Sequence, residues 1–374
     1  MVPLSPGETP LRITVDARYL KRPGIGISVY LDAAIRALCR SAAEVTLLTD
    51  EDAHARQLAG HYLTAATAVI AEPSGFRWEQ LGLRRYLKQH APDVHLAGAN
   101  YGLPAFFRGR TRMALVVHDL IPVLMPRLYL TNRPAWAAKY LLSMAAAVTA
   151  VDLVIANSHR TATDVRRLLR SKNVVVLYPS LPDQTGPSTS VRDERAPARY
   201  FVYSGGYDPR KNVAELLSAV DELQVDNAGV GLVCLGSVPA PLAELMDRRQ
   251  PLVLRTGYVS DEEKVGWLAG AAGLVYPSQF EGFGLPLVEA FLHGIPAVTG
   301  TGGSLREVAG EAAVFVDVDE PTSIARGMSR ALDESVRVSL LTNAESQLKA
   351  LRHEPSVDDI AGVLGDLVQQ DRSH

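Results

Sequence analysis

The sequence predicts an α/β protein with two doubly wound parallel sheets in tandem, and three observations support this prediction. Short apolar runs alternate with longer amphipathic stretches, as strands alternate with helices in such folds. The alternation stops at 181–199, a stretch rich in Pro, Ser and Thr, and then starts again. The length of 374 residues suits two domains. We therefore expect domains at 1–180 and 200–355, joined by a linker at 181–199.

The first domain begins with strand-like runs rich in β-branched residues. They lie at 12–16, 44–49, 67–70, 113–117, 152–156 and 173–177. Helical patterns lie between them, at 27–40, 78–90, 132–150 and 159–170. This alternation favours a parallel sheet with helices on both faces. We also expect a C-terminal helix at about 356–374 to pack back on this domain.

The second domain repeats the pattern. Its expected strands are 200–204, 230–235, 252–255, 272–276, 296–299 and 313–316. Its expected helices are 211–224, 240–248, 261–271, 286–293, 322–334 and 336–351. Ligands of such folds bind outside the carboxyl ends of the strands, so two domains of this kind predict a central cleft between them as the site.

Composition excludes several classes. Hydrophobic residues make up 47% and charged residues 21%, which is ordinary for globular proteins and excludes a disordered or fibrous chain. Two cysteines, Cys39 and Cys234, form neither a disulfide framework nor a thiolate metal cluster. The first residues contain no apolar signal-peptide core, and no uninterrupted apolar run is long enough to span a membrane. We expect a cytoplasmic protein that does not bind nucleic acid.

Charge is unevenly distributed between the halves. Residues 1–180 carry 22 Lys and Arg against 13 Asp and Glu, a net +9, whereas residues 181–374 carry 16 against 28, a net −12. A basic half suits an anionic acceptor or peripheral contact with the inner face of a membrane. Chance placement of solvated charge is the alternative.

The most informative segment is 276–296, YPSQFEGFGLPLVEAFLHGIP. A strand ends near Tyr276, and the turn Gly282-Phe283-Gly284 leads into a helix. The backbone N–H groups of Gly284, Leu285 and Leu287 would be unpaired there, and such a helix end attracts a pyrophosphate.

Two carboxylates, Glu281 and Glu289, flank this turn. Carboxylates accept hydrogen bonds from vicinal sugar hydroxyls, so a sugar nucleotide suits the whole segment. The alternative is that Glu289 only complements the helix dipole and Glu281 is a solvated loop residue.

A second segment, 200–212, reads YFVYSGGYDPRKN. A strand runs into Gly205 and Gly206, and Arg210 and Lys211 then stand at a helix start. Two cations at that end oppose the helix dipole, which makes sense if they neutralise phosphate. The alternative is a solvated basic turn.

Two weaker motifs lie in the first domain. His118 ends an apolar strand in 113–126, where a hydrogen-bonded turn residue is the alternative. Gly24-Ile25-Gly26 precedes a helix but lacks the third glycine of the dinucleotide fingerprint, so we interpret Gly26 only as a point of close backbone approach.

Metal chemistry has little support. Asp317-Val318-Asp319 formally matches the DxD pattern of metal-dependent sugar transfer, but no other ligand cluster lies nearby in the sequence, and we expect a solvated turn. No Cys/His spacing suggests structural zinc.

Together these segments resemble the retaining glycosyltransferases of the GT-B fold, in the group 1 or family 4 class. The resemblance covers nearly the whole chain. The Glu-x7-Glu signature runs from Glu281 to Glu289, and SGGYDPRKN matches a second block. TGYVSDEE, VHDLIP, VIANS and SLREVAGEAAVFVD also look like family blocks.

The resemblance implies a nucleotide-sugar-binding second domain and an acceptor-binding first domain. It implies that Arg210 and Lys211 stabilise the pyrophosphate leaving group in place of a metal, and that Glu281 and His118 contact the donor sugar. Glu289 would hold the ribose hydroxyls. The remaining donor contacts implied are Gly26, Gly205, Gly206, Tyr258, Val259, Asp261, Gly282, Phe283, Gly284 and Leu285.

The expected reaction is metal-independent transfer of a hexosyl group, with retention of configuration and no cofactor beyond the nucleotide sugar. The resemblance favours GDP-mannose or a related GDP-sugar, with UDP-sugars next. The expected acceptor is a hydroxyl of a saccharide, a lipid-linked saccharide or a natural product. Two alternatives stay open. One is a GT-B phosphorylase or epimerase. The other is a non-catalytic membrane-associated subunit that uses the basic run Arg166, Arg167, Arg170 and Lys172.

Overall fold

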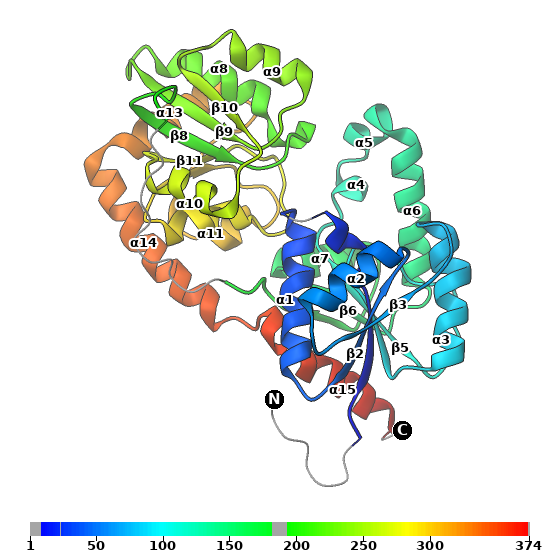
Figure 1. Cartoon of the computed structure of the whole chain (residues 1–374). Helices are drawn as coiled ribbons and strands as arrows, with labels where there is room; N and C mark the ends of the chain where they lie inside the picture. The colour runs from blue at the N-terminus through cyan, green and yellow to red at the C-terminus, as the bar shows by residue number, and fades with distance from the viewer. Residues whose placement is uncertain (1–8, 23, 182–192, 373–374) are drawn as a thin grey trace. The chain divides into compact units, whose positions relative to one another are not determined.

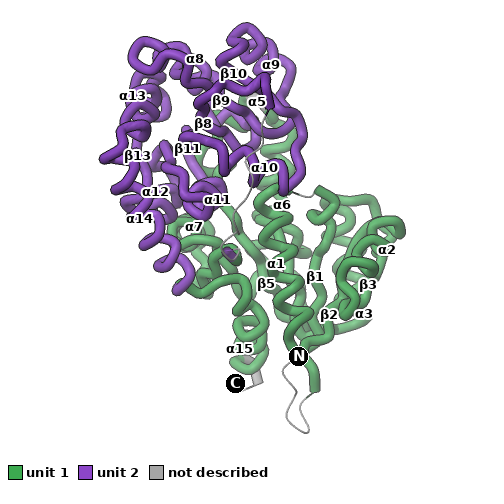
Figure 2. The backbone as a smooth tube through the Cα atoms, turned by 60° about the vertical axis from the view of Figure 1, so that its left-hand side comes forward, with its two compact units in different colours: residues 1–180, 354–374 green, residues 181–353 purple. Residues whose placement is uncertain are grey.

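A computed structural model describes residues 9–22, 24–181 and 193–372 (Figure 1). Most of the expected linker, residues 182–192, and the end of the chain at 373–374 lie outside the described residues. The chain divides into two compact units, one of residues 1–180 and 354–374 and one of residues 181–353 (Figure 2). Each unit is built on one parallel sheet, which confirms the expected fold class.

The first unit holds a seven-stranded sheet in the order β3-β2-β1-β4-β5-β6-β7. All of its strand pairs are parallel. The strands are β1 (Arg12–Asp16), β2 (Glu44–Thr49), β3 (Ala66–Val69), β4 (Val94–Ala97), β5 (Arg112–Val117), β6 (Leu153–Ala156) and β7 (Val174–Val176).

Helices cover both faces of this sheet. On one face α1 and α15 pack in a cluster around Leu31, Ile35 and Leu364, and on the other α3, α6 and α7 pack around Leu87, Met144 and Val165. The helices are α1 (Gly26–Arg40), α2 (Asp52–His61), α3 (Arg84–His90), α4 (Ile121–Leu124), α5 (Pro126–Asn132), α6 (Pro134–Val148), α7 (His159–Leu168) and α15 (Ile360–Arg372), with short turns η1 (Arg18–Lys21), η2 (Trp78–Leu83) and η4 (Val357–Asp359).

The second unit holds a six-stranded parallel sheet in the order β10-β9-β8-β11-β12-β13. The strands are β8 (Arg199–Ser204), β9 (Val230–Leu235), β10 (Val253–Gly257), β11 (Gly273–Tyr276), β12 (Ala297–Thr299) and β13 (Ala313–Phe315). Residues of β8, β9 and β11 are almost completely buried, as expected for strands covered on both faces.

Helix α13 packs against α8, and α14 packs against α11 and α12. The helices are α8 (Val213–Leu223), α9 (Ala240–Asp247), α10 (Asp261–Ala269), α11 (Leu285–Leu292), α12 (Leu305–Ala309), α13 (Pro321–Leu332) and α14 (Glu334–His353), with a short turn η3 (Pro209–Lys211).

The central strand β4, the helix α2 and the short helices α4, α5 and α12 were not expected from the sequence. β4 reads VHLA, and its buried polar residue His95 interrupts the apolar pattern. The structure accommodates it because His95 Nδ1 lies 3.0 Å from the Thr14 hydroxyl on neighbouring β1. Local pattern alone does not reveal a partner 81 residues away.

None of the described helices combines the length and the apolar character needed to span a lipid bilayer.

Candidate active site

The candidate site lies where the strand order of the second sheet reverses direction. β8 and β11 are neighbours there, although β9 and β10 separate them in sequence. The segment after β8 carries Arg210 and Lys211, and the segment after β11 carries Glu281. Such switch points at the carboxyl ends of strands form ligand crevices in open α/β sheets.

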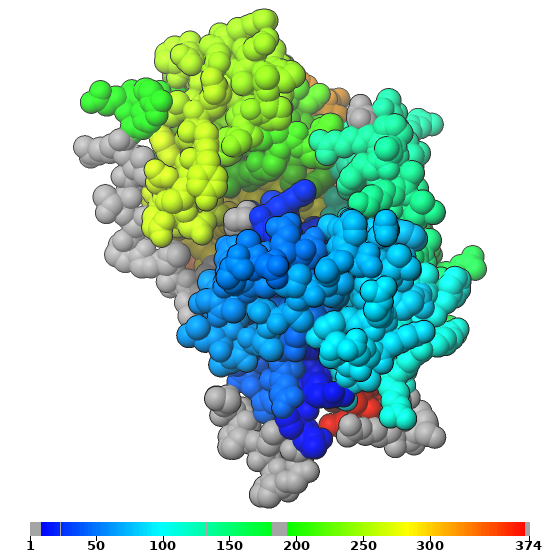
Figure 3. All heavy atoms as spheres, turned by 45° about the vertical axis from the view of Figure 1, so that its right-hand side comes forward, coloured from blue at the N-terminus to red at the C-terminus, as the bar shows by residue number. Residues whose placement is uncertain are grey.

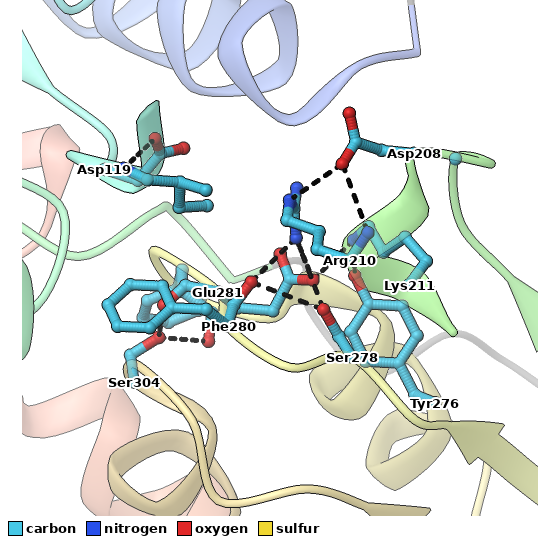
Figure 4. Close-up of polar contacts among 12 residues, drawn as sticks. Asp119, Asp208, Arg210, Lys211, Tyr276, Ser278, Phe280, Glu281 and Ser304 are labelled. Carbon is cyan, nitrogen blue, oxygen red and sulfur yellow. Dashed lines mark hydrogen bonds and ion pairs between the residues drawn. The ribbon is translucent and has the colours of Figure 1, made fainter. Parts of the chain in front are cut away.

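The two cations converge on one oxygen atom of Glu281 (Figure 4). Lys211 Nζ lies 2.5 Å and Arg210 Nη1 lies 2.6 Å from Glu281 Oε1. Arg210 Nη1 also donates to the Phe280 carbonyl at 2.7 Å, and Lys211 Nζ donates to the Tyr276 hydroxyl. These contacts fix both cations against the segment that follows β11.

All three side chains are largely buried. The Lys211 side chain is 8% exposed, that of Glu281 10% and that of Arg210 15%. Burial alone would raise the pKa of Glu281, but the charges of Lys211 and Arg210 outweigh it and lower that pKa to about 2. The alternatives of a solvated loop carboxylate and a solvated basic turn are therefore wrong.

The turn that presents the cations is built from its own polar residues. The Asp208 carboxylate accepts a hydrogen bond from the backbone N–H of Arg210, and Pro209 is the first residue of the 3-10 turn η3. Asn212 then adopts a left-handed conformation at φ 51°, and its amide donates to the Val318 carbonyl and to the Asp319 carboxylate, each at 3.0 Å. Asp319 is exposed, as expected. Its carboxylate also accepts a hydrogen bond from Asn212 and so holds this turn in position.

The glycine-rich turn before α11 has the geometry that the sequence predicts. Gly284 is the N-cap residue of α11 with φ 104°, a conformation that favours glycine, and Pro286 stands in the first helical turn. Gly294 follows the helix with φ 63°. One expectation is wrong, because the N–H of Leu287 is not unpaired but donates to the Gly284 carbonyl at 3.0 Å.

A loop that the sequence analysis missed supports this turn. Ser304 Oγ donates to the Phe283 carbonyl at 2.8 Å, and its N–H donates to the Glu281 carbonyl at 3.0 Å. A Cβ atom at Gly302 would lie 1.7 Å from the Gln279 carbonyl oxygen. Only glycine at 302 lets the two backbones approach this closely. The sequence signal was the glycine-rich run Gly300-Thr301-Gly302-Gly303 that follows β12.

Glu289 does not join the Arg210 cluster. It lies on α11 and pairs with Lys264 of α10 at 2.6 Å, a partner that the sequence analysis also missed. Both side chains are 27% exposed, so Glu289 remains accessible. Tyr258 is 85% exposed and lies with Val259 between β10 and α10, and Asp261 is the first residue of α10.

Gly205 and Gly206 follow β8 in different environments. A Cβ atom at Gly205 would lie 3.0 Å from the Tyr203 hydroxyl and 3.1 Å from the Tyr276 ring, whereas one at Gly206 would meet nothing within 4 Å. Gly205 therefore allows tight packing, and Gly206 borders open space.

His118 and Gly26 belong to the first unit. The His118 ring is buried, and its Nε2 lies 3.0 Å from the Gly98 carbonyl, which can only accept. Burial lowers the pKa of His118 to about 4, so the ring is neutral at pH 7, with Nδ1 as its acceptor. Gly26 begins α1, and a Cβ atom there would meet nothing within 4 Å.

This arrangement can bind an anion and hydrogen-bond hydroxyls. Arg210, Lys211, Glu281 and the N-terminus of α11 lie in one unit, in the segments that follow β8 and β11, and Glu289 stands within α11. In the part of the chain that the structure describes, no group of three or more His, Cys, Asp or Glu residues could hold a metal ion.

Two family models match the chain, one to each unit. The model described as glycosyltransferase family 4 matches residues 25–184, and the one described as glycosyl transferases group 1 matches residues 198–334.

Curated relatives include the O-antigen chain mannosyltransferase B of Escherichia coli, which is 33% identical over 162 residues, 41% of this chain and 42% of that protein. The MMP alpha-(1→4)-mannosyltransferase of Mycolicibacterium hassiacum is 35% identical over 151 residues, 38% of this chain and 36% of that protein. The chain therefore matches less than half the length of these relatives.

Among solved structures, sucrose-phosphate synthase from Thermosynechococcus elongatus matches with a TM-score of 0.72 at 19% identity, over 97% of this chain and 99% of that one. At this identity the likeness shows the fold alone.

Proposed function

The chain belongs to glycosyltransferase family 4 and has the GT-B fold, and from this premise we propose that it moves a hexosyl group from a nucleotide-diphosphate sugar to an acceptor hydroxyl. The proposed transfer retains the configuration of the sugar and requires no metal ion. The acceptor is a saccharide, a lipid-linked saccharide or a natural product. The proposed location is the cytoplasm, because a chain with only two cysteines, Cys39 and Cys234, suits a reducing compartment.

The observation that carries this proposal is the convergence of Arg210 and Lys211 on Glu281. Breaking the sugar–phosphate bond leaves a nucleoside diphosphate with growing negative charge. Two fixed cations beside the N-terminus of α11 stabilise that charge, and removal of one such donor typically costs about 3 kcal/mol of transition-state stabilisation. The two cations thus neutralise the leaving phosphate, as a divalent metal ion does in metal-dependent enzymes.

Glu281 has two roles in the proposed reaction. It holds the two cations in place before donor binds, and its carboxylate accepts hydrogen bonds from hydroxyls of the donor sugar. When the pyrophosphate arrives, Arg210 and Lys211 share their donors between phosphate and carboxylate. Backbone N–H groups at Gly284 and Leu285 add to the phosphate contacts.

We assign the other donor contacts as the resemblance implies. Glu289 accepts from the ribose hydroxyls, and its exposure beside Lys264 is compatible with that role. The segment of Tyr258, Val259 and Asp261 faces the base. His118, neutral at pH 7, offers Nδ1 to a sugar hydroxyl.

GDP-mannose is the favoured donor, and a UDP-sugar is the next candidate. Support for mannose comes from the two mannosyltransferases that resemble this chain. A solved Anabaena complex with UDP and glucose is 19% identical and shares only the fold, so it does not decide between the two donors.

Thermal unfolding with GDP, UDP, dTDP or ADP in the presence of EDTA tests the donor site. A diphosphate at 100 times its Kd adds about 2.7 kcal/mol of stability, which is easily measured. We expect one nucleotide to shift the wild-type transition and to shift that of Arg210→Ala far less. The exposed Arg255, which pairs with Asp247 on the same unit, supplies the matched control Arg255→Ala.

Absence of a shift with every nucleotide, or equal shifts in wild type and Arg210→Ala, would contradict the proposed donor site. The same preparations, assayed for sugar transfer with EDTA present, test metal independence.

A further inference from the structure

Helix α6 in the first unit is apolar on its outer face as well as its inner face. Its inner residues Tyr140 and Met144 pack in the core. Its outer face repeats Ala135, Ala138, Leu142 and Ala145 at helical spacing, all exposed. A helix that is apolar all round is normally covered on all sides. In the described part of the first unit this outer face is not covered.

Two exposed aromatic side chains lie near the ends of α6, Trp136 one turn before Tyr140 and Phe106 beside Thr149. Trp136 is 41% exposed, and its ring stacks on that of Tyr140 at 5.6 Å between centroids. Phe106 is 66% exposed with φ 48°, and its N–H donates to the Thr149 hydroxyl just beyond α6. We call the surface of Phe106, Leu130, Trp136, Leu141 and Leu142 the α6 face. Figure 3 shows residues of α5 and α6, in blue-green, at the surface of the first unit.

The segment of the chain that contains α6 is strongly basic. From Pro104 to Val151 the chain carries six cations and a single acid, Asp119. The cations are Arg108, Arg110, Arg112, Arg127, Arg133 and Lys139. Arg112 pairs with Asp152 at 3.3 Å, whereas Arg108, Arg127, Arg133 and Lys139 are exposed.

Exposed apolar side chains on a basic segment favour a membrane surface over a second copy of the chain as the binding partner. Two copies of the chain meeting through this face would bring like charges together, which is unfavourable. An anionic bilayer offers both an apolar interior for Leu142 and negative headgroups for the cations. Tryptophan and tyrosine side chains favour the headgroup level of membranes.

We infer that the α6 face binds the surface of an anionic phospholipid bilayer, with α6 lying in the interfacial plane. This moves the expected membrane contact away from the basic run at 166–172. Arg166 there donates to the Val174 carbonyl, and α7 offers no comparable exposed apolar face in the described residues. The inference does not depend on the proposed function, because membrane binding requires no sugar donor.

Tryptophan fluorescence of the full chain with vesicles tests this inference. The chain has three tryptophans, and Trp78 and Trp267 are 0% and 4% exposed, so Trp136 reports on the α6 face. Vesicles of phosphatidylcholine with 30% phosphatidylglycerol should shift the emission to shorter wavelength, and brominated lipids should quench it. Vesicles of phosphatidylcholine alone should do so far less, and salt should weaken the effect.

Matched variants give the second readout, co-sedimentation with the same vesicles. Leu142→Glu should lower partitioning at least about tenfold, and Arg133→Glu or Lys139→Glu should lower it about fivefold each. Leu63→Glu and Arg56→Glu place the same changes at exposed positions outside the α6 face and should bind as wild type.

Three results would overturn the inference. The first is no binding of wild type to the anionic vesicles. The second is equal binding by Leu142→Glu and Leu63→Glu. The third is a shift of the tryptophan emission without vesicles that grows with protein concentration, together with an increase in sedimenting mass. That result would assign the α6 face to contact with a second copy of the chain.

Discussion

Lys211 and Glu281 form an ion pair at 2.5 Å between two segments that lie 70 residues apart in sequence, each directly after a neighbouring strand. Arg210 reaches the same carboxylate oxygen at 2.6 Å. The carboxylate therefore orients both cations. A nucleotide that binds here meets side chains already in position, which reduces the entropy lost on binding.

Breaking this pair should cost stability as well as turnover. Lys211→Met leaves a buried carboxylate with only Arg210 to compensate it, so we expect a loss of about 3–5 kcal/mol in the free energy of unfolding. Glu281→Gln together with Lys211→Met should cost less than the two single changes summed. Urea unfolding followed by tryptophan fluorescence, to which the buried Trp267 of the second unit contributes, measures the cycle. Additive single changes would mean that the pair contributes no coupling.

The low pKa of Glu281 predicts an acid-dependent loss of stability. Its folded pKa of about 2 lies below the ordinary value of 4.5, so its contribution is present above pH 4.5 and is lost as pH falls toward 2. The difference in unfolding free energy between wild type and Glu281→Gln should be about 2 kcal/mol smaller at pH 3 than at pH 6. A difference that stays constant over this range would contradict the assignment.

Glu289 offers a way to separate binding from folding. Its pair with Lys264 is about a quarter exposed, so Glu289→Ala should change stability by less than about 1 kcal/mol. If Glu289 accepts from the ribose, the same variant should raise the KM for the donor about tenfold or more. Asp221→Ala removes a comparable pair with Arg249 elsewhere in the unit and serves as the control. An unchanged KM would remove Glu289 from the donor site.

Gly302 should tolerate no side chain. Alanine there would push Cβ into the Gln279 carbonyl oxygen, and the backbone of 279–281 must then move. We expect Gly302→Ala to destabilise the unit by about 1–3 kcal/mol and to reduce the thermal shift caused by nucleotide. Gly362→Ala on α15, where a Cβ atom meets nothing within 4 Å, is the matched control and should be neutral or stabilising. Wild-type nucleotide shifts in Gly302→Ala would show that the close approach is unimportant for the site.

The buried His118 should titrate well below neutral pH. Folding lowers its pKa from 6.5 to about 4, so the stability it contributes is complete above pH 6.5 and falls as pH drops toward 4. The decline between pH 7 and pH 4.5 should be smaller in His118→Gln, while the buried His95 is present in both proteins and cancels. Imidazole NMR of His118 showing a pKa near 6.5 would contradict a neutral, buried ring.

Much of the candidate site could be proposed from the sequence because its residues lie in two continuous segments. Arg210 and Lys211 follow an apolar strand pattern, and Glu281 precedes a glycine turn with a proline behind it. Arg210 and Lys211 stand out in the sequence alone, because two cations at the start of a helix oppose the helix dipole. The supporting residues could not be found this way. Ser304, Lys264 and Gly302 act through contacts with residues that lie 21–25 positions away in sequence.

The sequence by itself determined the alternation of strands and helices, the division of charge between the halves, and the chemical groups available at each strand end. These are local properties, because side-chain periodicity and turn chemistry depend on near neighbours. Only the tertiary structure decided that β8 lies beside β11, and hence that Lys211 meets Glu281. It also decided that the outer face of α6 stays exposed. Strand order and burial arise from packing among distant segments, which no local pattern encodes.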